Sequence, residues 1–331
     1  MSAPENKPGG GGSTLRPPPN LPGPRDKPPR RRGLWLGLAA IPVVLLLLGV
    51  GFYAVLALNA NNELKRDDTL MVGYDGRPTP GIGKNFLVLS QSAPNRTEVV
   101  MLVHRNALGN RLFLVSLPQN LLVDVDGKSV RLHDITNPGQ VVKAVEGVFD
   151  ARIEHVATMD IKGFVGLTES LGGLVVKNPH ASTTATGISF PAGEINLRGE
   201  EALAFLNDES PMPDRDTVLA ERQRSVLRAL VLKVLKPETL ANPITFNAVL
   251  NQVTEYVTVD RGLTSTEMWN LATSTHVKNS SDLVAAQAPI WGASSTAEGE
   301  EVALVDKDKA RELGAALRED KMNDYSRRYP A

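Results

Sequence analysis

The feature that most constrains this chain is an uncharged, apolar run that covers residues 34–58. About 20 apolar residues in a helix span the hydrocarbon core of a bilayer, so this run is long enough to cross it with some tilt. Pro42 is tolerated inside such a helix. A cleaved signal peptide is the alternative, but its apolar core measures only about 7–15 residues. We therefore expect a permanent membrane anchor.

The charges on the two sides of this run predict its orientation. Seven Lys or Arg residues precede it and end in Arg30-Arg31-Arg32, whereas Lys65 and Arg66 after it are balanced by acidic neighbours. The positive-inside rule then gives a single-pass protein of the cell membrane, with a cytoplasmic amino terminus and an extracytoplasmic domain. Residues 1–33 are rich in Pro and Gly and predict a disordered tail, and residues 59–82 predict a polar linker.

Composition excludes several classes of function. The net charge is −1, which argues against a general nucleic-acid binder, because such a protein needs a basic face. The chain has no cysteine, so disulfides, thiol catalysis and Cys metal sites are impossible. The five histidines are scattered without ligand spacing, and this pattern does not indicate a His-based metal site.

From residue 83 onward, apolar strands alternate with helical patterns, which predicts a layered α/β domain over residues 83–322 and a flexible tail at 323–331. We expect strands at 86–89, 99–103, 112–115, 153–159, 174–176 and 302–305. We expect helices at 141–149, 161–171, 216–235 and 308–321, and a mainly helical region at 237–284. Gly172 and Gly173 indicate the end of the second of these helices.

The stretch 197–223 contains the clearest candidates for a binding or catalytic site. Asp214 or Asp216 can cap the helix that follows, and Arg222 and Gln223 come soon after its start. The amino-terminal end of a helix favours an anion, so aspartates and an arginine there suit a metal-bridged phosphate. A solvated, charged first turn is the plainer alternative.

A series of short motifs follows the same order as in a known family. They are Asn85-Phe86-Leu87-Val88, Arg96-Thr97-Glu98, Ser116-Leu117-Pro118, Gly163-Phe164-Val165 with Leu171-Gly172-Gly173, Leu197-x-Gly199-x-x-Ala202-Leu203, Asp214-x-Asp216 and Arg222-Gln223. Together, behind one membrane anchor, they resemble the LytR-CpsA-Psr domain of cell-envelope proteins, found mainly in Gram-positive bacteria. The resemblance implies a layered α-β-α fold. It also implies a magnesium-dependent phosphotransferase that moves glycopolymer from a polyprenyl-pyrophosphate carrier onto peptidoglycan.

The resemblance also implies roles for individual residues. Arg96, Arg222 and Gln223 would be catalytic and would bind pyrophosphate, with Arg215 as a further pyrophosphate contact if it shares a helix face with Arg222. Glu98 and Asp216 would bind magnesium, with Asp214 as a possible addition. A structural ion-pair network is the alternative explanation of these same charges.

Several ionic positions of the family are changed in this chain. The positions carry Gln91, Gln119, Asn207-Asp208-Glu209 and Leu219, where the family has aspartates or arginines. Removing one electrostatic donor commonly costs about 10²–10³ in rate, so these losses predict weak magnesium binding and little turnover.

Three functions are therefore open. The chain is an active phosphotransferase with altered chemistry, or a degenerate relative that still binds polyprenyl-linked glycopolymer, or a structural envelope protein without ligand. We favour the second, with the lipid in an apolar cavity between the sheet and the helices at 141–149 and 161–171. Peptidoglycan and the membrane are its expected partners, and nucleic acid is not.

Overall fold

The computed structural model describes residues 63–71, 73–91, 97–206, 208, 210, 215–236, 238–239, 242–277, 279–286, 288–296 and 299–330, which all belong to the unit Tyr53–Ala331. The expected tail at 1–33 and the expected anchor at 34–58 lie outside the described residues. Among the helices within these ranges, none is both long and apolar enough to cross a membrane. The single-pass topology therefore stays a prediction.

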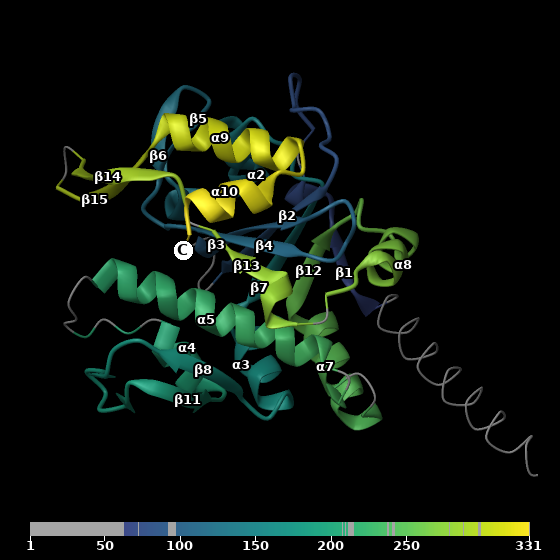
Figure 1. Ribbon diagram of the computed structural model, residues 1–331, viewed down its shortest axis with the longest axis vertical. Helices are drawn as coiled ribbons and strands as arrows, with labels where there is room; N and C mark the ends of the chain where they lie inside the picture. Colours follow the sequence, from purple (N-terminus) through teal and green to yellow (C-terminus); the bar gives the residue numbers. More distant parts are fainter. Residues whose placement is uncertain are drawn as a thin grey trace, which may run out of the picture. The chain divides into compact units, whose positions relative to one another are not determined.

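A seven-stranded mixed sheet runs through the middle of the described domain (Figure 1). Its strand order is β1-β12-β7-β2-β3-β4-β13. The strands are β1 (Lys65–Asp67), β2 (Lys84–Gln91), β3 (Thr97–Arg105), β4 (Leu112–Leu117), β7 (His155–Asp160), β12 (Val257–Asp260) and β13 (Leu283–Ala285). β2 is antiparallel to β3 and parallel to β7. Side chains alternate between the two faces of a strand, so each face of this sheet can pack against its own layer of helices.

The first layer, which we call the α2–α9 core, contains α2 (Pro138–Phe149), α9 (Lys307–Arg318) and α10 (Met322–Arg328). Leu87, Leu102 and Phe113 project into it from β2, β3 and β4 and are at most 1% exposed. The Asn137 side chain accepts a hydrogen bond from the Gly139 amide and so begins α2.

The second layer, which we call the α3–α5 core, lies on the other side of the sheet (Figure 1). It contains α3 (Ile161–Ser170), α4 (Glu200–Leu206), α5 (Arg215–Leu235) and α7 (Pro243–Tyr256), together with the hairpin of β8 (Leu174–Asn178) and β11 (Gly193–Leu197). Val226 and Leu230 of α5 pack here against Phe205 of α4. The long helix α5 is thus held by an apolar stripe of its own.

Shorter elements complete the described domain. They are α8 (Ser265–Ser274), the 3-10 turns η1 (Asp68–Leu70), η2 (Leu132–Asp134) and η3 (Ser280–Asp282), and the strand pairs β5 (Leu122–Val125) with β6 (Lys128–Arg131), β9 (Ser182–Thr183) with β10 (Ser189–Phe190), and β14 (Ile290–Ser295) with β15 (Glu301–Val305).

The structure confirms the strands and helices that were predicted from a clear apolar pattern in the sequence. Each expected strand from 86 to 176, and the one at 302–305, overlaps an observed strand, and each expected helix overlaps α2, α3, α5 or α9. Gly172 and Gly173 have φ angles of +72° and +94° directly after α3, which are the left-handed values that a glycine C-cap requires.

The region 237–284 is mainly helical, as expected, through α7 and α8. It also supplies β12 and β13, which were not expected, because their three or four residues are too short to show a period and depend on pairing with β7 and β4. Two expectations are corrected. The linker at 59–82 contributes β1 to the sheet, and Leu70 to the α2–α9 core. Most of the tail at 323–331 is the helix α10, anchored by buried Met322 and Tyr325.

The placement of the expected lipid cavity is also corrected. The apolar residues of α2 are buried in the α2–α9 core, whereas Leu167 and Leu171 belong to the α3–α5 core. The helices at 141–149 and 161–171 therefore lie on opposite sides of the sheet and do not share one cavity (Figure 1).

Candidate functional site

The motif residues of β2 and β3 meet at the end of the sheet where β2 finishes. Gln91 pairs with Thr97 of β3 on one side and with Asp160 of β7 on the other. Because Ser90 pairs with Val99, Glu98 is an extra residue in β3 and forms a β-bulge. Bulges re-aim side chains and are over-represented beside active sites. The backbone thus places Glu98 next to Gln91, the position where the family carboxylate is missing.

The chain joins the sheet at this same end. Lys65 at the start of β1 pairs with Thr258 of β12, which pairs with Thr158 of β7, and Thr158 pairs with Leu89 of β2. β1 runs antiparallel to β2, so its first residue, Lys65, lies toward the end of the sheet where β2 stops.

Of the seven predicted site residues, the structure describes one side chain. Arg96 and Asp214 lie outside the described residues. Glu98 has a described backbone in β3, and Arg215, Asp216 and Gln223 have described backbones in α5, but their side chains lie outside the description. The roles proposed for these residues stay predictions, and Arg222 is the residue whose surroundings are known.

The guanidinium of Arg222 is fully buried, with 0% of the residue exposed. Its Nη1 lies 2.8 Å from Oδ2 of Asp208, and its Nε donates to Oδ1 of Asn178 at 3.1 Å. Its Nη2 donates to the His180 carbonyl oxygen at 3.0 Å and to Oγ of Ser182 at 2.7 Å. All three guanidinium nitrogens are therefore engaged by partners inside the protein.

Aromatic rings enclose this arginine as well. The Arg222 guanidinium carbon lies 4.4 Å from the ring centre of Phe205 and 5.9 Å from that of Phe190. The two rings pack edge to face at 5.1 Å. Stacking on a ring face stabilises a cation, and apolar walls exclude water, so the rings strengthen the hydrogen bonds around Arg222.

Asp208 is the anionic half of this cluster. Its Oδ2 accepts hydrogen bonds from Arg222 and from the Ser182 hydroxyl, and its Oδ1 accepts from the Ser210 amide at 2.9 Å and lies against the Ser210 hydroxyl. Burial alone would raise the pKa of Asp208, but these hydrogen bonds from Ser182, Ser210 and Arg222 outweigh it and hold the pKa well below the usual range. The carboxylate is thus ionised at neutral pH and neutralises Arg222.

Asp208 was not predicted as a site residue, because in the sequence the Asn207-Asp208-Glu209 stretch indicated only the loss of family arginines. The signal that could have identified Asp208 is the charge reversal itself, because a surviving arginine in an apolar helix needs a carboxylate partner. Asn178 and Ser182 carried no comparable signal, since their role depends on how the β8–β10 segment folds back onto α5.

Magnesium is the cofactor that the predicted carboxylates would suit, because it prefers oxygen ligands. The described residues contain no group of three or more His, Asp or Glu side chains that could hold a metal ion. The Asp160 side chain beside Gln91 is used as the N-cap of α3 and accepts from the Lys162 amide at 2.8 Å. The described side chains do not assemble a magnesium site, so the expected metal depends on Glu98 and Asp216.

The sheet face opposite the α2–α9 core is apolar and only partly covered, since Met101 and Leu114 on it are buried but several neighbours are not. Phe86 and Val88 of β2, Val103 of β3 and Ala157 of β7 are half-buried, although they lie in central strands. The hydroxyl of Ser116 faces the same side and, among the described residues, is a buried polar atom without a hydrogen-bond partner. This face reaches the end of the sheet where Gln91 and Glu98 lie.

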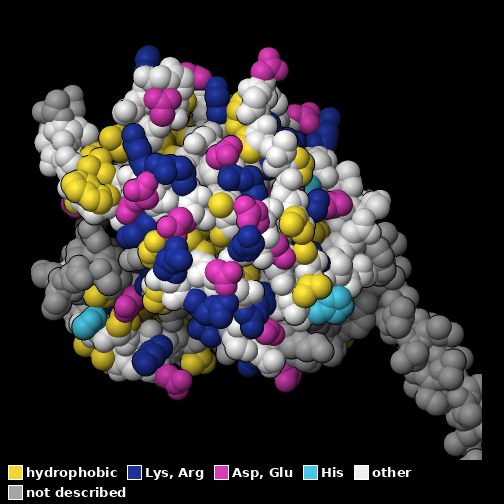
Figure 2. All heavy atoms as spheres, turned by 45° about the horizontal axis from the view of Figure 1, so that its top comes forward, with side chains coloured by type: hydrophobic (Ala, Val, Ile, Leu, Met, Phe, Trp, Pro, Cys, Tyr) yellow, Lys and Arg dark blue, Asp and Glu magenta, His cyan; other side chains and the backbone are white. Residues whose placement is uncertain are grey.

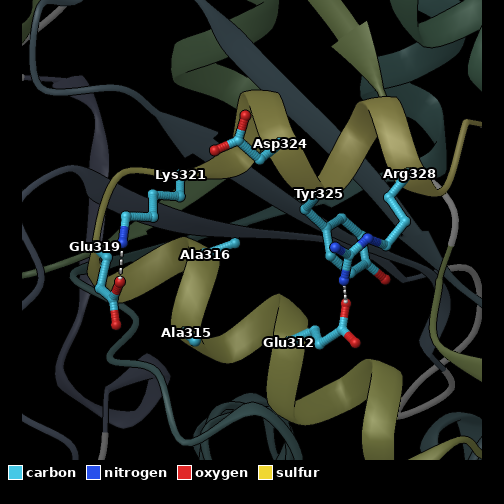
Figure 3. A pocket seen from close by; sticks show the side chains of 8 residues that line it. All are labelled: Glu312, Ala315, Ala316, Glu319, Lys321, Asp324, Tyr325 and Arg328. Carbon is cyan, nitrogen blue, oxygen red and sulfur yellow. Dashed lines mark hydrogen bonds and ion pairs between the residues drawn. The ribbon is translucent and has the colours of Figure 1, made fainter.

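A surface pocket of about 320 Å³ lies elsewhere, between α9 and α10 (Figure 3). Four of its charged side chains are paired with one another, Lys321 with Glu319 and Arg328 with Glu312. Lys and Arg are interspersed with Asp and Glu over the face drawn in Figure 2, with no extended basic patch. The pocket belongs to the α2–α9 side of the sheet, whereas Arg222 belongs to the other.

The LytR_cpsA_psr family model matches residues 55–319. The chain is 30% identical over 168 residues to the cell wall biosynthesis protein LcpA of Corynebacterium glutamicum, covering 50% of this chain and 32% of LcpA. It is 25% identical over 170 residues to the polyisoprenyl-teichoic acid–peptidoglycan teichoic acid transferase TagU of Enterococcus faecalis, covering 50% of this chain and 55% of TagU. The matches therefore span less than two thirds of these relatives.

Solved structures share the fold. An Actinomyces oris LytR-Csp2A-Psr enzyme matches with a TM-score of 0.62 and 21% identity, over 77% of this chain and 96% of its own. TagT bound to LI-WTA matches with a TM-score of 0.54 and 18% identity, over 80% of this chain and 98% of its own. The layered α/β arrangement of the described domain is the fold of these proteins.

Proposed function

This chain belongs to the LytR-CpsA-Psr family, and on that premise we propose that it is a cell-wall assembly protein that binds polyprenyl-phosphate-linked glycopolymer and has impaired transfer activity. In this proposal residues 34–58 anchor it in the cell membrane, and the domain works outside the membrane beside peptidoglycan. LcpA is a cell wall biosynthesis protein and TagU is a teichoic acid transferase that acts on peptidoglycan, and these relatives supply the class of substrate.

The observation that carries the proposal is the state of Arg222. Phosphoryl transfer from a pyrophosphate depends on cations that clamp the developing charge. The buried Asp208 carboxylate already neutralises this arginine, and Asn178 and Ser182 engage its other nitrogens. A guanidinium held in this way has little uncompensated charge left for a diphosphate. Arg222 therefore stabilises the domain instead of the transition state.

The half-buried apolar face supports lipid binding. A polyprenyl tail needs apolar walls with few polar groups, and Phe86, Val88, Val103 and Ala157 provide such a wall along the sheet. This face ends beside Gln91 and Glu98, where the phosphate of a bound lipid would lie. The start of β1 at the same end would bring that phosphate toward the membrane.

Lipid binding is tested with the full chain in detergent. Polyprenyl phosphate at about 100 times its dissociation constant stabilises the protein by roughly 2.7 kcal/mol and raises its melting temperature. Val88→Lys puts a charge on the apolar face and abolishes this shift. Val175→Lys, at a residue 63% exposed on β8, keeps it. A folded wild-type protein whose melting temperature does not change at saturating lipid would contradict the proposal.

Catalysis is tested by transfer from a lipid-pyrophosphate-linked oligosaccharide to peptidoglycan fragments. We expect wild-type turnover near background, with a gain in the triple variant Gln91→Asp, Gln119→Arg and Leu219→Arg, because each change restores an ionic group of the family. Gln140→Arg, an exposed position on α2, adds a charge without that effect. Magnesium-dependent wild-type turnover at the rate of active relatives would establish the alternative, an active phosphotransferase.

A further inference from the structure

Asp208 lies in surroundings that resemble a binding pocket for a small oxyanion. Each of its carboxylate oxygens has two donor groups beside it: Arg222 and Ser182 at Oδ2, and the amide and hydroxyl of Ser210 at Oδ1. Guanidinium, hydroxyl and backbone amide are the groups with which proteins hold phosphate oxygens. The Asp208 carboxylate therefore occupies the position of an anionic ligand.

The donors come from three separate parts of the chain. Arg222 belongs to α5, Ser182 to β9, and Ser210 to the link between α4 and α5, which also carries Asp208. Arg222 and Ser182 are in addition hydrogen-bonded to each other at 2.7 Å, and Asn178 fixes Nε of Arg222. These contacts orient two of the donors independently of Asp208, so the pocket keeps part of its shape if the carboxylate is removed.

The positive charge of Arg222 also indicates a site for an anion. An arginine cannot lose its proton inside a protein, so Arg222 without Asp208 is a buried and uncompensated cation. The rings of Phe205 and Phe190 exclude water from its faces. Such a cation favours an anion, and the separate donors of Arg222, Ser182 and Ser210 favour one with several oxygens over a single-atom ion such as chloride.

We propose that Asp208 is an internal ligand of an oxyanion pocket formed by Arg222, Ser182 and Ser210, and that this pocket takes a phosphate-type ion when the carboxylate is absent. The Asp208 carboxylate fills this pocket, and neither its side chain nor that of Arg222 has exposed surface. The proposal deepens the proposed function, since it concerns the same arginine. Its test uses inorganic phosphate, so it can fail or succeed independently of lipid binding and transfer.

The test compares Asp208→Gly with Asp208→Asn in the full chain. The glycine variant removes the methylene and the carboxylate and so empties the place of the anion, whereas the asparagine variant removes the charge but keeps the pocket filled. We expect inorganic phosphate to raise the melting temperature of Asp208→Gly saturably, with a stoichiometry near one in calorimetry. Wild type and Asp208→Asn show no such response, and chloride at matched ionic strength gives none in any variant.

A second substitution tests the donors. Adding Ser182→Ala to Asp208→Gly removes one hydrogen bond to the ion, and a hydrogen bond to a charged group corresponds to about a tenfold or larger loss of affinity. If Asp208→Gly does not fold, Asp208→Ser, a smaller change, is measured instead. A folded glycine or serine variant that ignores phosphate, or that responds equally to chloride, would overturn the proposal and leave a purely structural ion pair.

Discussion

At the scale of single residues, the buried partner Asp208 changes the role that the motif predicts for Arg222. A guanidinium is suited to an anionic ligand, but Arg222 lies about two turns inside α5, and Asp208 and three neutral acceptors surround it at 2.7–3.1 Å. Burial makes the ion pair costly to form and still more costly to break, because removing one partner leaves the other charge unpaired.

The first prediction concerns the stability of that pair. Asp208→Ala lowers the free energy of unfolding by about 3–5 kcal/mol, because it leaves Arg222 buried without a counter-charge. Asp308→Ala breaks an ion pair of similar length with Arg311, but both side chains are well exposed and the cost is at most about 1 kcal/mol. Thermal or urea unfolding of both variants measures the difference, and equal costs would show that the buried pair contributes no more than a surface pair.

The second prediction concerns acid. The pKa of Asp208 is lower in the folded protein than in an unfolded chain, where it is about 4. Such a group contributes its full stability above the unfolded pKa and loses it as the pH falls toward the folded pKa. We expect the stability of wild type to fall steeply below about pH 4, whereas Asp208→Asn, which cannot titrate, starts lower and falls less. Parallel acid curves for the two proteins would contradict the assignment.

At the scale of elements, close backbone contacts decide where helices sit. A Cβ built on Gly314 of α9 would lie 1.7 Å from the carbonyl oxygen of Phe149, at the end of α2. Gly147, in α2 itself, has no neighbour within 4 Å of such an atom. One glycine is therefore needed for packing between two helices, and the other is not.

The third prediction follows from these two glycines. Gly314→Ala forces α9 away from α2 and costs about 1–3 kcal/mol or more, as overpacking does. Gly147→Ala stabilises the protein by roughly 0.5–1 kcal/mol, because alanine loses less backbone entropy in a helix. Opposite shifts in melting temperature check both expectations, and a neutral Gly314→Ala would mean that the helices separate easily.

At the scale of the whole molecule, the two faces of the central sheet are buried to different degrees. The α2–α9 core is closed by fully buried side chains, whereas the opposite face keeps half-buried apolar residues that run to the end where β1 begins. This asymmetry suits a protein with one face for stability and one for a lipid, as the proposed function requires.

The fourth prediction concerns the topology of the whole chain. If the anchor at 34–58 leaves the amino terminus inside, protease added to intact protoplasts digests the domain after residue 59 and spares residues 1–33. Reversing the charge of Arg30, Arg31 and Arg32 to Glu weakens the positive-inside signal and protects part of the domain. Digestion of only the first 33 residues in the wild type would show the opposite orientation.

The sequence alone determined the elements whose patterns are local. Strands β2, β3, β4 and β7 and helices α2, α3, α5 and α9 were predictable because apolar periodicity and capping residues act within a few neighbouring positions. The family was also predictable, because its motifs keep their order along the chain. The short strands β1, β12 and β13 and the helix α10 were not, since each depends on a distant surface to pair with or to cover.

The tertiary structure alone decided the surroundings of Arg222. Its four acceptors are 14 to 44 residues away in sequence, and no periodic pattern links an arginine on α5 with residues of β8, β9 and the α4–α5 link. The sequence identified an arginine that an anion would suit, and the fold supplied that anion from within, because burying a guanidinium requires a carboxylate at the same depth.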